Sequence, residues 1–114
     1  MKPTTITTHL VEGESRPVLL KKYSNALYAA SWHEQSSERY PVLLNFMTME
    51  TMGLTNEVLL AIVLDRLETF EAGSNPCVEN SIAIAHLNTA LDYLKERTAR
   101  RIAQNVEGTM EPHE

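Results

Sequence analysis

The sequence predicts an α+β protein in which short antiparallel β-strands come first and an antiparallel two-helix hairpin follows, assembled as an oligomer. Residues 1–52 are rich in β-branched and aromatic residues, with turn-forming residues between them. Residues 53–109 instead show helix caps and apolar residues at helical spacing. A chain of 114 residues with 43% hydrophobic content builds only a modest core, so contact between copies would add burial. We expect a single domain over residues 1–114.

Four segments of the first half are candidates for strands. The stretch TTITTHLV, residues 4–11, has the β-branched content of a strand. Residues 17–23 and 27–33 are predicted as two short strands joined by a turn near Ser24–Asn25. The segment YPVLLNFMTM, residues 40–49, is predicted as another strand or an ordered extended stretch, because a short apolar run cannot be typed by periodicity.

The first predicted helix has signals at both ends. Thr55 is a natural N-cap, Glu57 lies in the first turn and Gly73 follows the end. Residues 58–64 are apolar on nearly every side of the helix, which predicts burial against more than one neighbour.

The second predicted helix runs from about residue 76 to 104. Asn75 can cap it, and Pro76 fits the first helical position, where its missing N–H costs nothing. Because only three to five residues connect the two helices, we expect an antiparallel hairpin.

Charge and composition limit the classes of partner. The net charge of −5 argues against a protein that binds long DNA or RNA. Residues 95–106 form a single short basic patch, with four basic residues against one acidic residue, which favours a small anion. Cys77 is the single cysteine, as is typical of a reducing compartment. The N-terminus has no signal-peptide core and the longest apolar run is too short to span a membrane, so we predict a cytoplasmic protein.

One face of the second helix combines an apolar stripe with polar ends. Four aliphatic residues are spaced three and four apart: Ile84, Leu87, Leu91 and Leu94. Extending the stripe backward reaches Asn80, and extending it forward reaches Thr98 and Arg101, with Arg97 one turn before Arg101.

Two interpretations of the polar residues stay open. In the first, they simply leave the core at the helix ends, where arginines near the C-terminus also interact favourably with the helix dipole. In the second, Arg97 and Arg101, four residues apart, present two planar guanidinium groups side by side, which suits a phosphate or pyrophosphate.

Helix geometry constrains any site that uses both ends of this face. Asn80 and Arg97 are 17 residues apart, or roughly 25 Å at about 1.5 Å per residue, so one straight helix cannot bring both to the same small ligand. Two copies with antiparallel second helices could. Phe70, near the turn and Asn80, could stack on a base. The sequence therefore predicts a ligand site shared between subunits.

Other candidate sites are weaker. The histidines lack metal-ligand spacing among themselves or with Cys77, and no glycine-rich loop matches a phosphate-binding motif, so we predict neither a metal nor a cofactor. Asp65, Glu68 and Glu71 are predicted as a solvated helix face rather than an acid–base pair, and we predict no catalytic residue. The tail NVEGT is either a C-terminal stop with Gly108 in a turn, or a segment that folds over a ligand with Thr109 as a donor.

The second half of the chain resembles the helical-hairpin domain of phage anti-CBASS and Thoeris anti-defence proteins. The resemblance covers about residues 53–109 and rests on the paired helices, on the run ENSIAIAHLNTALDYL and on the arginines that follow it. Proteins of this family are not enzymes. They act as sponges that bind cyclic oligonucleotides or cyclic ADP-ribose isomers and keep them from the host effector.

The resemblance also implies a site between protomers. By spacing, the family's aromatic residue, asparagine and two arginines match Phe70, Asn80, Arg97 and Arg101 here. The function expected is sequestration of a cyclic nucleotide immune signal by a homo-oligomer, from dimer to hexamer. The alternatives are a phosphodiesterase-like enzyme, for which we find no metal cluster or general base, and an oligomeric structural or regulatory protein without a nucleotide ligand.

Overall fold

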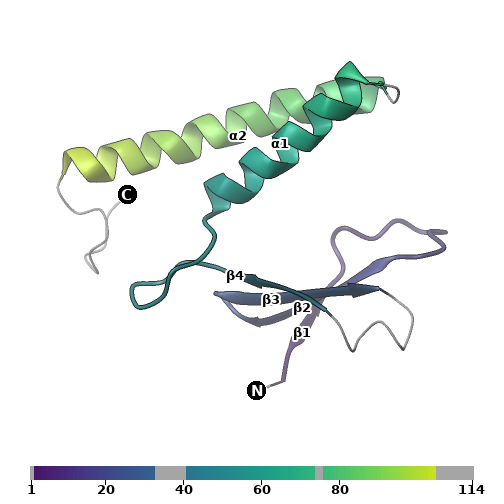
Figure 1. The fold of residues 1–114 in the computed structure, drawn as a ribbon, viewed down its shortest axis with the longest axis horizontal. Helices are drawn as coiled ribbons and strands as arrows, with labels where there is room; N and C mark the ends of the chain where they lie inside the picture. Colours follow the sequence, from purple (N-terminus) through teal and green to yellow (C-terminus); the bar gives the residue numbers. More distant parts are fainter. Residues whose placement is uncertain (1, 33–40, 74–75, 105–114) are drawn as a thin grey trace. The chain divides into compact units, whose positions relative to one another are not determined.

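The computed structural model describes residues 2–32, 41–73 and 76–104 of the chain. Within these residues it is α+β, with four antiparallel strands followed by two helices, as the sequence predicts (Figure 1). The chain divides into two compact units, one up to Leu54 and the other from Thr55 onward. Assembly into an oligomer stays a prediction.

The first unit is an antiparallel meander with the strand order β1-β2-β3-β4. The strands are β1 (Thr4–Ile6), β2 (Val18–Ser24), β3 (Leu27–Trp32) and β4 (Val42–Asn45). The turn predicted near Ser24–Asn25 joins β2 to β3, and the hydroxyl of Ser24 accepts a hydrogen bond from the Ala26 amide at 3.1 Å.

The strand predicted over residues 4–11 is wrong beyond Ile6. After Ile6 pairs with Leu20, the chain turns, and the Leu10 amide donates to the Thr7 carbonyl at 3.0 Å. His9 Nε2 then donates to the carbonyl of Val18 at 2.6 Å, which ties the turn to the start of β2. β-Branched content alone therefore overestimates the length of this strand, because pairing with β2 determines where the strand ends.

The segment that follows β4 closes on itself before the first helix. The Met47 amide donates to Leu54 O and the Leu54 amide donates to Asn45 O, both at 2.8 Å. Gly53 lies where two backbone segments of the loop approach each other closely, since a Cβ there would be 2.7 Å from the Asn45 carbonyl oxygen. Glycine is therefore required at this position by close approach of the backbone.

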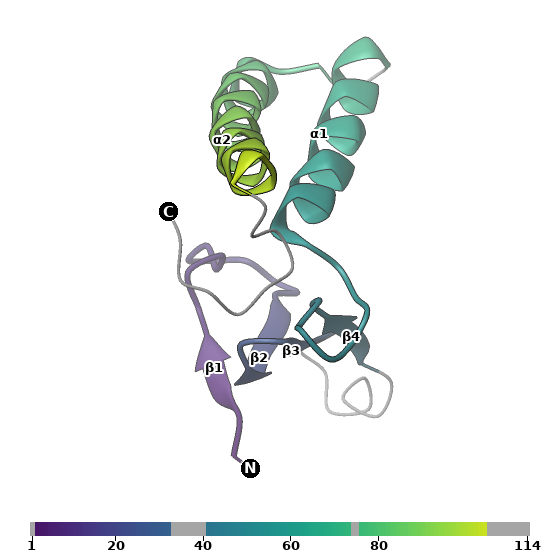
Figure 2. The same cartoon turned by 90° about the vertical axis from the view of Figure 1, so that its left-hand side faces the viewer.

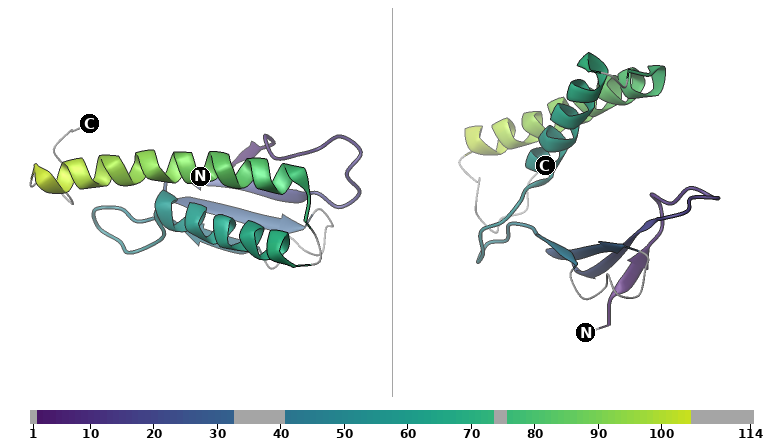
Figure 3. Two further views of the ribbon diagram at one scale, coloured as in Figure 1. Left: turned by 90° about the horizontal axis from the view of Figure 1, so that it is seen from above. Right: turned by 45° about the vertical axis from the view of Figure 1, so that its right-hand side comes forward.

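The second unit is an antiparallel hairpin of α1 (Asn56–Ala72) and α2 (Val78–Ala103), which lie side by side in two different views (Figures 2 and 3). The predicted cap is confirmed, because Thr55 Oγ1 accepts a hydrogen bond from the Val58 amide at 3.1 Å. The face of α1 towards α2 repeats at three and four residues: Glu57, Leu60, Leu64, Leu67 and Glu71 are its half-buried or buried members.

The predicted start of α2 needs correction. The helix begins at Val78 with Cys77 at the N-cap position, so Pro76 is not its first residue. Asn75, which the sequence predicts as the cap, lies outside the described residues. Cys77 makes no side-chain cap hydrogen bond. Its backbone amide instead donates to Glu71 Oε1 at 2.7 Å, so α1 supplies across the turn the acceptor that a local cap would give.

The apolar run of α1 is only partly covered by α2. Leu64 is 6% exposed, yet Ile62 and Val63 on neighbouring faces are 47% and 38% exposed. Within the hairpin unit, α2 therefore buries α1 on one side, and burial against a further neighbour stays a prediction.

Candidate functional site

The stripe predicted on the second helix is confirmed by burial along α2. The members of the stripe are half-buried: Asn80, Ile84, Leu87, Leu91, Leu94, Thr98 and Arg101. Arg97 is exposed. The polar ends of the stripe therefore continue the packed face instead of turning away from α1. A burial pattern with this period is expected when one face of a helix lies along a neighbouring helix.

The loop end of the hairpin, defined here as Phe70, Glu71, Cys77, Asn80 and Ser81, is organised around one carboxylate. Glu71 Oε1 accepts from the Cys77 amide and Oε2 accepts from Ser81 Oγ, both at 2.7 Å. The Asn80 side chain has the smallest effect of the three on the pKa of this carboxyl. These contacts, the Ser81 hydroxyl most of all, hold the pKa of the Glu71 carboxyl below its ordinary value, because each donor favours the ionised form.

The prediction that Glu71 lies on a solvated face needs correction, because its carboxylate also accepts hydrogen bonds from the start of α2. Asp65 and Glu68 are exposed, as predicted, but Glu71 is half-buried. Its three-residue spacing from Glu68 suggested a common face, but each such step rotates by about 60° around the helix. Spacing from Leu64 and Leu67 was the signal that could have identified it, since Glu71 extends their apolar stripe.

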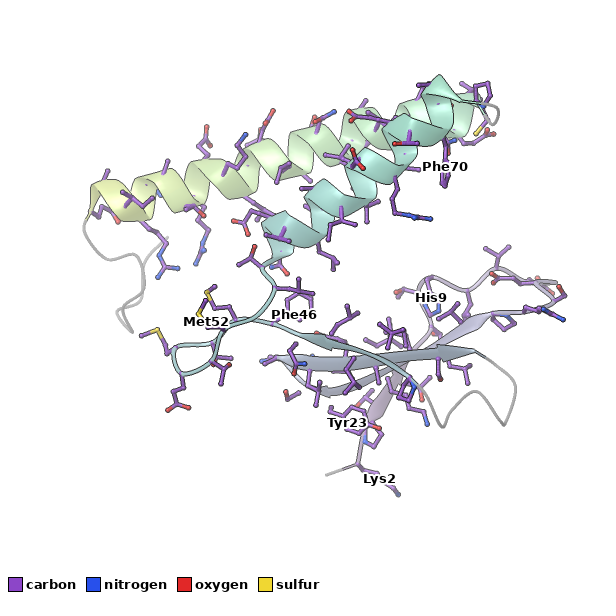
Figure 4. All side chains as sticks on the ribbon, viewed as in Figure 1. Lys2, His9, Tyr23, Phe46, Met52 and Phe70 are labelled. Atoms are coloured by element: carbon purple, nitrogen blue, oxygen red, sulfur yellow. The ribbon has the colours of Figure 1, made fainter. Side chains whose placement is uncertain are left out.

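Phe70 projects from α1 at the loop end (Figure 4). Its side chain is 39% exposed, which leaves ring surface for a planar ligand group. The guanidinium carbon of Arg66, one turn earlier, lies 5.4 Å from the ring centroid in a cation–π contact. Sequence reasoning missed this arginine, although Arg66 is the single basic residue of residues 53–94 and lies four positions before Phe70.

The open end of the hairpin, defined here as Glu57, Arg97, Thr98 and Arg101, has a different chemistry. Thr98 Oγ1 donates to Glu57 Oε2 at 3.1 Å, which joins the start of α1 to the last turns of α2. Arg101 is half-buried, with its Nε atom buried, and Arg97 is exposed. The hydroxyl in the stripe thus has a partner in the same chain, and a basic group lies on each side of it.

The structure places two of the predicted site residues at each end of the hairpin and separates the two pairs. Phe70 and Asn80 belong to the loop end, while Arg97 and Arg101 belong to the open end. Both Asn80 and Arg97 lie on the single continuous helix α2, so about 25 Å of helix axis separates them. One chain therefore does not assemble all four around a small molecule. Thr109, the fifth predicted residue, lies outside the described residues.

The described part of the chain contains no cluster of side chains suited to binding a metal ion. Residues 2–32, 41–73 and 76–104 contain no group of three His, Cys, Asp or Glu side chains that could hold a metal ion. Cys77 is exposed and carries a free thiol. Over the same ranges neither helix is both long and apolar enough to cross a membrane.

Comparison with known proteins gives a relative from a phage. The chain is 46% identical over 59 residues to "Thoeris anti-defense 1" of Bacillus phage SBSphiJ7, and the alignment covers 52% of this chain. It covers 42% of the relative, so the chain matches less than half of that protein's length. No protein-family model matches the chain. The resemblance to Thoeris anti-defence proteins that the sequence predicted is confirmed by this similarity.

Proposed function

We propose that this protein is a phage anti-defence protein that binds a cyclic nucleotide immune signal in the host cytoplasm and so prevents activation of the host effector. The ligand class is that of cyclic ADP-ribose isomers and cyclic di- and trinucleotides. The observation that carries the proposal is the 46% identity over 59 residues to a protein named for Thoeris anti-defence. Sequestration requires tight binding and no chemical step, so we propose no enzymatic activity.

Each candidate residue has a role suited to its chemistry. Arg97 and Arg101 would bind the phosphates, because a guanidinium group donates two parallel hydrogen bonds to phosphate oxygens. Phe70 would stack on the base with its exposed ring. Asn80 would hydrogen-bond to the ribose or the base.

The pocket would form between two copies of the chain. If the second copy's α2 ran antiparallel, its open end would lie beside the loop end of the first copy, and two equivalent pockets would result. Exposed apolar side chains on both helices support such a contact, among them Ile62 on α1 and Ile82 and Tyr93 on α2.

Isothermal titration with cyclic ADP-ribose isomers and cyclic di- and trinucleotides tests the ligand class directly. We expect binding of at least one ligand below about 1 µM, since a sponge must compete with the effector for a scarce signal. Ligand recovered intact after heat denaturation of the complex would exclude cleavage. Absence of binding to all of these compounds at micromolar concentration would reject the proposal.

Complementation between two defective chains tests whether the pocket is shared. One variant carries Phe70→Ala and Asn80→Ala, and the other carries Arg97→Ala and Arg101→Ala. Neither should bind alone. After mixing and reassembly, a heterodimer regains one intact pocket of two, so random pairing of equal amounts restores about a quarter of the sites. A pocket built within one chain predicts no restoration.

Cysteine cross-linking tests the antiparallel arrangement. With Asn80 of one copy opposite Arg97 of the other, Thr89 lies near the midpoint and faces its own counterpart. In a Cys77→Ser background, Thr89→Cys should therefore form a disulfide-linked dimer on oxidation. Glu96→Cys, two turns further along the same face, is the matched control, because it pairs with itself only if the helices are parallel.

A second candidate function has one observation in its favour. Near both ends of α2 a hydroxyl donates to a carboxylate of α1 in the same chain, at Thr98–Glu57 and at Ser81–Glu71. This pattern is what an oligomeric structural or regulatory protein without a nucleotide ligand would also use to close its hairpin. The arginine double variant, considered in the Discussion, distinguishes the two.

A further inference from the structure

The strand β4 forms one edge of the sheet that the structure describes. The Phe46 amide donates to the Ala26 carbonyl at 2.7 Å, in the same register as the β3–β4 ladder. Hydrogen-bonded residues of an antiparallel pair alternate, so Leu44 also directs its backbone N–H and C=O groups towards β3. The residues between them, Leu43 and Asn45, therefore direct these groups away from the sheet.

The two ends of this edge are already restricted. The Asn45 carbonyl accepts the Leu54 amide, and the Met47 amide donates to the Leu54 carbonyl, both at 2.8 Å. At the other end, Pro41 has no N–H to donate. Among the described contacts, the outward groups left for a partner strand are the N–H and C=O of Leu43, the N–H of Asn45 and the C=O of Pro41.

These groups are self-complementary in one antiparallel register. With Leu43 opposite Leu43 of a second copy, the two residues exchange both backbone hydrogen bonds, and each Asn45 amide donates to the Pro41 carbonyl of the other copy. The two groups that cannot take part, the Pro41 nitrogen and the occupied Asn45 carbonyl, then lie opposite each other. Registers that place Leu43 opposite Pro41 or Asn45 keep only half of these hydrogen bonds among the described residues.

The side chains of β4 favour the same register. Val42 and Leu43 are 63% and 57% exposed, and residues 41–47 contain no charged residue. Proteins that avoid edge pairing place a charge on the edge or keep the strand very short, as in β1, which has only three residues. With Leu43 on the axis, Leu43 packs against its counterpart on one face of the sheet, and Val42 packs against Leu44 of the other copy on the opposite face.

We propose that β4 is an interaction surface for a second copy of this chain, paired antiparallel about a two-fold axis at Leu43. The two four-stranded sheets would then form one continuous sheet. If the helices also pair, two different two-fold contacts on one chain link dimers into a larger assembly. None of the residues assigned to the nucleotide lies in β4, so this contact goes beyond the proposed function and does not depend on it.

Amide hydrogen exchange in the unaltered full chain, resolved by residue, tests the register without any ligand. The Leu43 and Asn45 amides face away from their own sheet, yet both should exchange as slowly as the Leu44 amide, which faces β3. Rapid exchange of Leu43 and Asn45 beside a protected Leu44, at a chain concentration of about 1 mM, would overturn the proposal.

A charge on the axis tests the partner. Leu43→Lys places two like charges opposite each other and should lower the molar mass measured by light scattering to half or less. It should also speed exchange of the Asn45 amide about tenfold or more. Thr5→Lys is the matched control, because it adds the same charge at an exposed position of the other edge strand, β1, and should change neither quantity.

Two results of these measurements would contradict pairing between copies. One is an unchanged molar mass in Leu43→Lys. The other is protection of Leu43 and Asn45 in a protein of monomer mass, which would mean that a segment of the same chain covers β4. Neither measurement uses a nucleotide, so failure of the proposed function and failure of this contact are separate outcomes.

Discussion

The loop end and the open end of the hairpin are built by the same two helices, yet they differ in charge and in closure. At the loop end, the Glu71 carboxylate of α1 accepts hydrogen bonds from the Cys77 amide and the Ser81 hydroxyl. At the open end Glu57 receives the Thr98 hydroxyl, with Arg97 exposed and Arg101 half-buried nearby on α2. The first end presents an aromatic ring and an amide, and the second presents cations.

This difference teaches how to interpret polar residues in an apolar stripe. Thr98 is explained within one chain, because its hydroxyl donates to Glu57 of α1. The exposed Arg97 has no such explanation in the packing of the hairpin and raises the positive charge at one end only. A ligand hypothesis therefore depends on the arginines and on Phe70 more than on the hydroxyl with which the stripe ends.

Removal of the two arginines should have the largest effect on nucleotide binding. If binding were unchanged, the open end would not be the cationic half of the site. Arg97→Ala together with Arg101→Ala should weaken nucleotide binding by more than about 100-fold, because two charge-assisted contacts to phosphate are lost. The oligomer should persist, as measured by light scattering during size-exclusion chromatography. Lys95→Ala with Arg100→Ala is the charge-matched control and should bind within a few-fold of the unaltered protein. Dissociation of the oligomer without any ligand to lose would favour the structural function instead.

The middle of the hairpin contains its buried residue, Leu64, which should contribute most to the stability of the hairpin. Leu64 is 6% exposed, and Leu64→Ala should lower the free energy of unfolding by about 2–4 kcal/mol through lost burial and a cavity. Denaturant titration measures this change. Leu43→Ala in β4, where the side chain is 57% exposed, should cost less than about 1 kcal/mol. Equal losses for the two variants would contradict the assignment of the hairpin core.

Periodicity predicted the α2 face well because a single helical phase runs from Asn80 to Arg101. Periodicity did not identify the role of Glu71. Residues 58–64 are apolar on nearly every side of α1, so the sequence does not show which face packs against α2. The start of α2 was also misplaced, because the acceptor for the Cys77 amide comes from another helix and no local pattern announces it. Strand β1 ended early for a similar reason, since its length depends on its pairing with β2.

The candidate site was predictable in its residue types but not in its supports. Chemical type and spacing identify Phe70, Asn80 and the arginines, whereas the residues that hold them are found only from contacts: Arg66 beside Phe70, and Glu71 beside Asn80. Whether the two ends meet in an assembly depends on a second chain, which the periodicity of one chain does not determine.

Substitutions at Phe70 and Arg66 should reduce nucleotide binding less than loss of the arginines at the open end. They test which side chains of the loop end contact the ligand. Phe70→Leu keeps an apolar side chain but removes the stacking surface, and should weaken nucleotide binding about tenfold. Arg66→Ala removes the cation from the ring and should weaken binding by about two- to fivefold, as expected for an exposed cation–π contact. Titration calorimetry measures both. A stronger loss for Arg66→Ala than for Phe70→Leu would mean that Arg66 contacts the ligand itself.

Thr98→Val tests the closure of the open end with an effect on stability alone. It removes the hydrogen bond to Glu57 and should lower the free energy of unfolding by about 1 kcal/mol. Thr89→Val is the matched control, because the Thr89 hydroxyl donates to the Ala85 carbonyl of its own helix at 3.2 Å, and its replacement should change stability less. A larger loss from Thr89→Val in denaturant titration would contradict the proposed closure.

The smallest effect expected is that of pH on the loop end between pH 7 and pH 5. Contacts with Ser81, Cys77 and Asn80 lower the pKa of Glu71, so the carboxylate is ionised throughout this range. A group whose pKa is lower when folded contributes stability above its unfolded pKa, about 4.3 for glutamate, and loses it as pH falls through the lower folded value. The Cys77 backbone amide signal should therefore stay constant from pH 7 to pH 5 and move only below the ordinary glutamate pKa. Movement already near pH 6 would mean that a group other than Glu71 accepts the hydrogen bond of this amide, and the contrast between the two ends would then need another basis.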